Sequence, residues 1–394
     1  MNQLYKNKLG YAFYDFANSG YVLLFQAFLF PLFISSHYTD SSAAAQVWGY
    51  ILFFSNLLAI LSAPLIGRVA DLKDRIKIFS ILILSVSLLS FLSVLNNNVL
   101  VILIFFVIFN SSFELSQSIY DSFLNVISKN RDEKIDISTF AWGFGYLGGI
   151  LFVLVYFVLN KNGIENKYIL ASAALLYFIF SFLSVFLLKK ADQAHTRTFV
   201  NEMTNKNLKL FKLSKEIIYS LVIYFIVFLS TTAIINFSTL FFNKELHIEE
   251  KTIGMIMLAG QLLAFPLTIL SGKMAKKFGI LNTIRYCLIV WGIGLVCLVF
   301  AKTVIHVGII VFIFSFVIGS TQSLIRAHFS TIINTNRISE YYGYYGVSNK
   351  TGALISPLLV TLSIEILGSI RYVFSVIFIL ILIGYIITNK LERN

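Results

Sequence analysis

The chain has 394 residues, of which 58% are hydrophobic, 16% aromatic and only 13% charged. This apolar excess is larger than one water-soluble core buries, so it excludes an ordinary soluble protein and indicates an integral membrane protein. The net charge is +12, but no hydrophilic domain gathers the basic residues into one surface. We therefore expect no nucleic-acid partner.

Twelve apolar stretches follow one another along the chain, each long enough to cross a hydrocarbon core of about 30 Å as a helix of about 20 residues. We predict an all-α integral membrane protein of twelve transmembrane helices, the first of which begins near Tyr11 and is retained. The approximate centres of the stretches are Phe25, Leu57, Leu84, Ile108, Leu151, Phe178, Phe228, Leu262, Val290, Ile313, Pro357 and Leu380.

The basic residues predict how the chain is oriented. Most of the 31 Lys and Arg fall in the two tails and in the even-numbered loops, such as residues 73–77 and 273–285. Only a few, including Lys161 and Lys302, fall in the odd-numbered loops. By the positive-inside rule both termini are cytoplasmic, and we expect a multi-pass protein of the cytoplasmic (inner) membrane.

The longest hydrophilic stretch, residues 189–215, separates an N-terminal half at 1–188 from a C-terminal half at 216–394. When the sequence is aligned with itself at an ungapped offset of 205 residues, Gln117 aligns with Gln322 and Gly67 with Gly272. Internal repeats of this kind are typical of transporters. We predict two six-helix pseudo-repeats joined by a cytoplasmic linker.

The stretch GRVADLKDR, between the second and third helices, resembles the signature Gly-x-x-x-Asp-Arg/Lys-x-Gly-Arg/Lys of the major facilitator superfamily. Gly67 and Asp71 match its leading positions, while Asp74 stands where the second glycine is usual. The stretches YDFANSGY, QSLIRAHFS and EYYGYYGVSNKTG look like the vacuolar amino-acid effluxer branch of this superfamily. In that branch Asn is usual at the position of Asp121.

The resemblance implies a major facilitator fold and secondary active transport of a small polar solute by alternating access. It favours an amino acid as the solute, with protons or another ion as the coupling partner. We expect a monomer in the lipid bilayer, with no cofactor and no metal. A carrier of lipids or other amphiphiles, and a transport-inactive sensor on the same scaffold, stay open as alternatives.

The fourth apolar stretch carries one polar face. Asn110, Glu114, Gln117 and Asp121 recur at helical spacing, so they lie on the same side of one helix. Ionisable side chains at the centre of a bilayer cost about 2.5–3.5 kcal/mol, so this face is expected to line a cavity or meet a polar partner. Glu114 is the candidate proton-coupling group and Gln117 a candidate solute ligand. Alternatively, Glu114 serves helix packing only.

Four charged residues at helix ends are candidates for a cytoplasmic gate. At the repeat offset of 205 residues, Asp71 aligns with Lys276 and Asp121 aligns with Arg326, so acids in one half correspond to bases in the other. Acid–base contacts that form in only one conformation would hold such a gate shut. The alternative is that both bases follow the positive-inside rule and Asp71 caps a helix.

Further polar residues fall on helices that line the central cavity in the superfamily. Asp15 and Asn18 lie on the first helix and Asn236 on the seventh, and each is a candidate solute ligand or a helix-packing residue. Gln261 and Lys350 are further candidates on the eighth and eleventh helices. Lys350 would bind a solute carboxylate, pair with an acid, or extend to the cytoplasm.

Sequence motifs favour neither a nucleotide site nor an enzyme active site. The pattern Gly-x-Gly-x-x-Gly at residues 143–148 lies in apolar spanning sequence, so it does not indicate a nucleotide site. Gly145 and Gly149 instead predict close helix packing. The five His are scattered, and neither His-Glu-x-x-His nor Gly-x-Ser-x-Gly occurs, so we do not expect a membrane-embedded enzyme.

Overall fold

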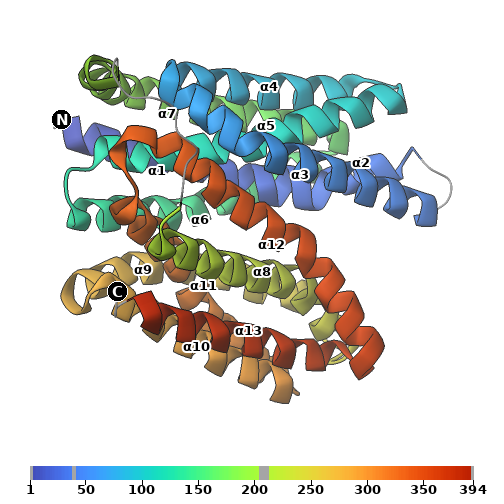
Figure 1. The fold of residues 1–394 in the computed structure, drawn as a ribbon. Coiled ribbons are helices and arrows are strands. Elements are labelled where there is room, and N and C mark those ends of the chain that lie inside the picture. The colour runs from blue at the N-terminus through green and yellow to red at the C-terminus, as the bar shows by residue number, and fades with distance from the viewer. Residues whose placement is uncertain (1–2, 38–40, 204–212, 392–394) are drawn as a thin grey trace. The chain divides into compact units, whose positions relative to one another are not determined.

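The computed structural model describes residues 3–37, 41–203 and 213–391, which form helices and short connections without any strand (Figure 1). Within these residues, twelve helical spans are long and apolar enough to cross a membrane. Each of the twelve predicted centres falls inside one of these spans, so the predicted fold class is confirmed.

Eight helical elements form the first six spans. Three of them, α1 (Gln3–Tyr21), the π-helix η1 (Val22–Leu29) and α2 (Phe30–Ser35), make one span together. The next five are α3 (Ser41–Leu72), α4 (Arg75–Leu95), α5 (Val99–Ile127), α6 (Arg131–Lys161) and α7 (Asn166–Met203).

The last six spans are α8 (Lys215–Lys244), α9 (Glu250–Phe278), α10 (Ile280–Phe300), α11 (Val304–Ile332), α12 (Ile338–Leu367) and α13 (Ile370–Leu391). A short 3-10 helix, η2 (Thr335–Arg337), precedes α12.

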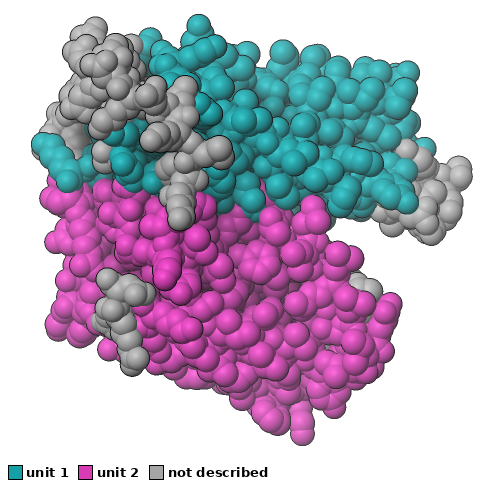
Figure 2. Space-filling view, viewed as in Figure 1, with its two compact units in different colours: residues 1–129, 144–208, 334–347 teal, residues 130–143, 209–333, 348–394 magenta. Residues whose placement is uncertain are grey.

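The chain forms two compact units, which Figure 2 colours teal and magenta. Unit 1 comprises residues 1–129, 144–208 and 334–347, and unit 2 comprises residues 130–143, 209–333 and 348–394. The helices α6 and α12 therefore contribute residues to both units. The division of the sequence into halves at 1–188 and 216–394 stays a prediction.

The helices pair in the same way in both units. In unit 1, α1 packs on α7, α3 on α5, and α4 on both α5 and α7. In unit 2, α8 packs on α13, α9 on α11, and α10 on both α11 and α13. Each pairing in unit 2 thus repeats one in unit 1 six spans later, as parallel six-helix repeats require.

Side-chain caps explain where several helices begin. Asp74 accepts the N–H of Lys77 at 3.1 Å before α4, and Asn98 accepts the first N–H groups of α5. Thr303 caps α11 in the same way. The start of α10 differs, because Gly279 precedes it with φ 89° and ψ 148° and has no side chain to act as a cap.

Two glycines let α6 approach α1 closely within unit 1. A Cβ atom on Gly145 would lie within 3.0 Å of Ser19 Oγ, and one on Gly148 within 3.0 Å of the Phe16 carbonyl oxygen. The close packing predicted for Gly145 is therefore present, and Gly148 takes part in it, while the role of Gly149 stays a prediction. Small residues allow this approach because they remove the side chains between two backbones.

Candidate functional site

The polar face of α5 is bonded to α1, η1 and α3 within unit 1. Gln26 Nε2 on η1 donates to Asn110 Oδ1 at 2.9 Å, and Asn110 Nδ2 donates to Ser55 Oγ on α3 at 2.8 Å. Further along the same helix, Gln117 Nε2 donates to Asn18 Oδ1 on α1 at 3.0 Å. Two amides of α5 are thus each paired with an amide of the first span.

Glu114 lies between these two amide pairs on the face of α5. It follows Asn110 by four residues and precedes Gln117 by three, which places all three side chains on one side of the helix. Its side chain is half-buried, whereas Asn110 is only 4% exposed. The structure therefore brings together Glu114, Gln117 and Asn18 from the predicted site.

The π-helix η1 positions one residue of this cluster. A π-helix places about one extra residue in each turn, is rare, and is frequently found at functional sites. Here it covers eight residues, and Gln26, the only polar residue among them, meets Asn110 on α5. The irregular turn therefore supplies a polar side chain that continues the hydrogen bonding of the α5 face.

Tyrosines hold α1 against α5 beside this cluster. The Tyr14 hydroxyl lies 2.5 Å from Ser116 Oγ, and the rings of Tyr11 and Tyr120 stack with centroids 4.2 Å apart. Asp15, the residue after Tyr14, is only 6% exposed on α1. This predicted candidate is therefore a buried acid within the helix packing of unit 1.

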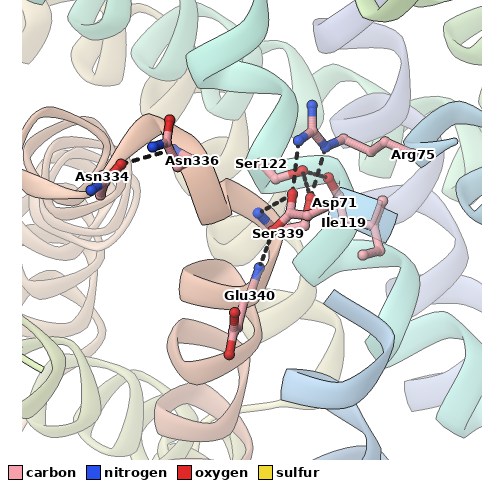
Figure 3. Close-up of polar contacts among 8 residues, drawn as sticks. All are labelled: Asp71, Arg75, Ile119, Ser122, Asn334, Asn336, Ser339 and Glu340. Atoms are coloured by element: carbon pink, nitrogen blue, oxygen red, sulfur yellow. Dashed lines mark hydrogen bonds and ion pairs between the residues drawn. The ribbon is translucent and has the colours of Figure 1, made fainter. Parts of the chain in front are cut away.

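A second polar cluster in unit 1 surrounds Asp71 at the end of α3 (Figure 3). Its carboxylate accepts Arg75 Nη2 and the backbone N–H groups of Ser339 and Glu340, each at 2.9 Å. Arg75 Nε donates to Ser339 Oγ at 2.7 Å, and that hydroxyl donates to Ser122 Oγ at 3.1 Å. The side chains of Asp71 and Arg75 are 5% and 6% exposed, so this is a buried ion pair.

The position of Asp71 also suits the start of α12. Ser339 and Glu340 are the second and third residues of this helix, whose first N–H groups have no acceptor inside the helix. A carboxylate here accepts two of these N–H groups and is attracted by the positive end of the helix dipole.

A polar cluster in unit 2 corresponds to the cluster around Asp71 and surrounds Lys276 and Arg326, two of the predicted gate residues. Lys276 Nζ forms an ion pair with Asp136 on α6 at 2.8 Å. Arg326 donates from Nε to Ser138 Oγ at 2.9 Å and from Nη2 to the Ser138 carbonyl at 3.0 Å. Its guanidinium also lies 5.1 Å from the centre of the Trp142 ring, within the range of a cation–π contact.

The two clusters occupy equivalent positions in the repeat. A Cβ atom on Gly67 would lie within 3.0 Å of the Ser339 carbonyl oxygen at the start of α12. Its repeat counterpart Gly272 would bring a Cβ atom equally close to Thr139 Oγ1 near the start of α6. In each unit, the first turns of a helix from one half of the sequence therefore pack against helices of the other half.

In unit 2, α11 carries a counterpart of one residue on the polar face of α5. Gln322, which the repeat offset aligns with Gln117, donates from Nε2 to Thr231 Oγ1 on α8 at 3.3 Å. Both residues are buried. The pair connects α11 with α8 as Gln117 and Asn18 connect α5 with α1.

Lys350 lies on the part of α12 that belongs to unit 2. It is only 5% exposed. The preceding residue, Asn349, donates from Nδ2 to the Tyr224 hydroxyl on α8 at 3.2 Å. The predicted cation is therefore buried and does not extend to the surface.

Three other predicted residues lie elsewhere. Asp121 is half-buried on α5, four residues after Gln117, and Gln261 is half-buried on α9. Asn236 belongs to α8, but its side chain lies outside the described part of the chain.

Sequence reasoning missed several residues that the structure brings into these clusters. Gln26 had a usable signal, since it is a lone amide inside the apolar stretch VLLFQAFL. Asp136 and Ser138 stand near the start of a helix, where acids and hydroxyls are common, so they gave no distinct signal. Ser339 contributes its hydroxyl and also its backbone N–H, and no sequence pattern reveals a backbone contact.

Comparisons with known proteins agree with this architecture. A family model described as "MFS/sugar transport protein" matches residues 15–388. The uncharacterized MFS-type transporter YxiO of Bacillus subtilis (strain 168) is 24% identical over 411 residues, covering 98% of this chain and 95% of that protein. Autophagy-related protein 22-1 of Aspergillus fumigatus is 23% identical over 308 residues, covering 68% of this chain but only 50% of that protein.

Solved structures share the fold at low sequence identity. The proton:xylose symporter XylE, bound to 6-bromo-6-deoxy-D-glucose, has a TM-score of 0.78 at 13% identity, covering 98% of this chain and 95% of that chain. A bacterial homologue of the iron transporter ferroportin, in an outward-facing state, has a TM-score of 0.73 at 12% identity over the whole of both chains. The family match over most of the chain shows that it belongs to the MFS/sugar transport protein family, and it is therefore a transporter of the major facilitator superfamily.

Proposed function

We propose that this protein is a secondary active transporter that carries a small polar solute by alternating access, with Glu114 coupling transport to protons. The observation that carries the proposal is the polar face of α5, where Glu114 lies between two amide pairs. Polar and ionisable side chains inside a membrane span are costly and are mostly retained for transport or proton transfer.

The bonding on this face suits a solute that exchanges hydrogen bonds with the protein. Gln117 and Asn18 are both half-buried and share one hydrogen bond, which they could exchange for one to a solute at low cost. Glu114 adds a carboxylate that takes up a proton or accepts the ammonium group of a solute.

An amino acid is the solute class to test first. The resemblance of YDFANSGY and QSLIRAHFS to the vacuolar amino-acid effluxer branch favours it. The buried Lys350 is a candidate for a solute carboxylate, with Asp15, Asn236 and Gln261 as further candidate ligands.

We further propose that the clusters around Asp71, Lys276 and Arg326, together with Asp121, form the gate. Transport by alternating access requires the two halves of the sequence to move against each other. The contacts of Asp71 with Ser339 and of Lys276 with Asp136 join opposite halves, so they would have to break in that movement. Contacts that exist in only one conformation set the balance between the two states.

The charge distribution supports a topology for this carrier. With most Lys and Arg in the tails and even-numbered loops, both termini would face the cytoplasm from the inner membrane. The protein would act as a monomer with halves at 1–188 and 216–394.

The test is solute uptake by the purified full chain in liposomes under an inward or outward proton gradient. Amino acids, peptides, sugars and a fluorescent lipid analogue are compared with protein-free liposomes. Gradient-dependent uptake of amino acids supports the proposal. Movement of the lipid analogue alone would point to an amphiphile carrier, and no movement under any gradient would favour a transport-inactive sensor.

A further inference from the structure

The π-helix η1 aligns Gln26 with Asn18 on the first span. Gln26 follows Asn18 by eight residues, and eight residues of regular α-helix would turn it about 80° past two full turns. Because a π-helix has about one extra residue per turn, each residue of η1 turns the chain by about 80° rather than about 100°. About half of the interval lies in η1, so the excess rotation is removed. Gln26 and Asn18 therefore lie on one face of the span.

The helix α5 presents two amides at the matching spacing. Asn110 precedes Gln117 by seven residues, which is nearly two turns of α-helix, so both side chains point to the same side. Gln26 donates to Asn110 at 2.9 Å, and Gln117 donates to Asn18 at 3.0 Å. Glu114 lies between the two pairs. The π-helix thus allows a second pair to form where a regular α-helix would turn Gln26 away.

A chain of hydrogen bonds fixes which end of the Gln26 amide is left over. The Ser55 hydroxyl donates its single hydrogen to the Leu52 carbonyl at 3.0 Å, so towards Asn110 it acts as an acceptor. Asn110 therefore turns Nδ2 to Ser55 and Oδ1 to Gln26. Gln26 in turn has to donate from Nε2. Its Oε1 atom remains as an acceptor that has no partner within the described part of the chain.

This leftover acceptor is within reach of a ligand. Ser55 is completely buried and Asn110 is 4% exposed, whereas Gln26 is half-buried and its Oε1 atom is not enclosed by protein. A polar group without a partner is costly in hydrocarbon, so an unpaired amide oxygen in a membrane span indicates contact with water or with a polar ligand. The chain of bonds that begins at the Leu52 carbonyl therefore ends in an acceptor that is available for binding.

We propose that Gln26 belongs to the solute site and that its Oε1 atom accepts a hydrogen bond from an N–H or O–H group of the solute. This inference rests on the proposed transport function and names the chemistry that the solute presents at this point. The ammonium group of an amino acid and the hydroxyl of a sugar both qualify. A carboxylate or an ether does not, because the bond to Asn110 keeps the donor end of Gln26 occupied.

The first experiment determines whether position 26 faces water, and it does not depend on transport. In liposomes, Gln26→Cys should react with a charged thiol reagent that does not cross membranes, added on both sides. Phe28→Cys is the control, because Phe28 lies on the same helix and is 44% exposed on the outside of the span, where it meets lipid. It should not react above the background that Cys287 and Cys297 give in the unmodified chain. Equal reactivity at positions 26 and 28 would overturn the proposal, whatever the protein transports.

The second experiment compares uptake of amino acids and of sugars in liposomes. Gln26→Leu should raise the KM of the carried solute about two- to tenfold, as expected for the loss of one neutral hydrogen bond, at unchanged proton flux per solute. Asn56→Leu is the matched control, because this half-buried amide bonds only its own helix, at the Leu52 carbonyl. An effect on amino acids assigns the donor to an ammonium group, and an effect on sugars assigns it to a hydroxyl.

Analogues without the donor test the direction of the bond. An N-trimethylated amino acid keeps its positive charge but has no N–H, and a deoxy sugar lacks one hydroxyl. The KM of such an analogue should be the same for the wild type and for Gln26→Leu. An unchanged KM of the parent solute in Gln26→Leu would overturn the proposal and leave the transport function standing. Absence of any uptake by the wild type would count against the transport function, and the reaction of Gln26→Cys would then decide the proposal.

Two deletions test the part played by η1. Without Leu23, Gln26 follows Asn18 by seven residues, so a regular α-helix keeps it on the same face. Without Ala27, a regular helix leaves Gln26 about 80° away from that face. We expect a KM near the wild-type value in the first variant and a raised KM, as in Gln26→Leu, in the second. Equal KM values in two variants of equal thermal stability would overturn the role of η1 in placing Gln26.

Discussion

Asp71 and Arg75 form a buried ion pair at 2.9 Å, and the same carboxylate accepts the N–H groups of Ser339 and Glu340 at the start of α12. Since residues 71 and 339 come from opposite ends of the sequence, one side chain joins three helices of unit 1.

Replacement of Asp71 by Ala leaves the buried guanidinium of Arg75 without its counter-charge. Removing one partner of a buried pair costs about 3–5 kcal/mol, so thermal unfolding in detergent should occur at a clearly lower temperature. Asp74→Ala in the same loop is the matched control. It removes only the cap that accepts the Lys77 N–H, worth about 1 kcal/mol. Equal destabilisation by the two variants would contradict a special role for Asp71.

Arg326→Lys should be costly although it keeps the charge. The guanidinium makes two hydrogen bonds to Ser138 and lies over Trp142, a geometry that a lysine ammonium does not reproduce. We expect a loss of about 1.5–3 kcal/mol in stability, measured by thermal unfolding. Arg337 is 24% exposed and lies 3.6 Å from the Glu340 carboxylate, so Arg337→Lys should change stability by less than about 1 kcal/mol. A larger loss of stability in Arg337→Lys than in Arg326→Lys would contradict a special role for the Arg326 guanidinium.

Alanine substitutions at Gly67 and Gly272 should both destabilise the protein, but only the one at Gly272 should be rescued by a second substitution at the contacting residue. An alanine at 272 meets the side chain of Thr139, so Thr139→Ala should largely restore the stability of Gly272→Ala. An alanine at 67 meets the backbone carbonyl of Ser339, which no substitution removes.

Thermal unfolding of the single and double variants tests this difference. Ser339→Ala should leave Gly67→Ala destabilised, because the carbonyl stays in place. The control is Gly49→Ala, since a Cβ atom at Gly49 meets nothing within 4 Å. It should be neutral or stabilising by about 0.5–1 kcal/mol, as expected for Gly to Ala inside a helix. Rescue of Gly67→Ala by Ser339→Ala would contradict the backbone contact.

Hydropathy predicted the twelve spans because a helix in a bilayer must be apolar over its whole length, a property that single residues reveal without any partner. The polar face of α5 was also predictable, since helical spacing alone places Glu114 and Gln117 on one side. Their partners were not, because the bond from Gln117 to Asn18 joins residues 99 positions apart. The same limit applies to Lys276, which was singled out while its partner Asp136 was not.

Gln117→Ala should slow solute transport without unfolding the protein. The side chain is half-buried and gives up one hydrogen bond to Asn18, so the expected cost in stability is only about 0.5–1.5 kcal/mol. Initial rates in liposomes, at equal amounts of reconstituted protein, measure the effect. Ser62→Ala is the control, because the Ser62 hydroxyl bonds only its own helix, at the Leu58 carbonyl. Unchanged rates in Gln117→Ala would remove this residue from the solute site.

The central claim is that Glu114 couples solute movement to protons. It is tested most directly by recording proton flux with a pH-sensitive dye inside liposomes while a solute gradient is applied. We expect solute-driven proton flux with the wild type and with Glu249→Gln, which replaces an exposed acid just before α9. Glu114→Gln should abolish the proton flux and still exchange solute across the membrane. Equal proton flux in Glu114→Gln and the wild type would show that Glu114 does not couple transport to protons.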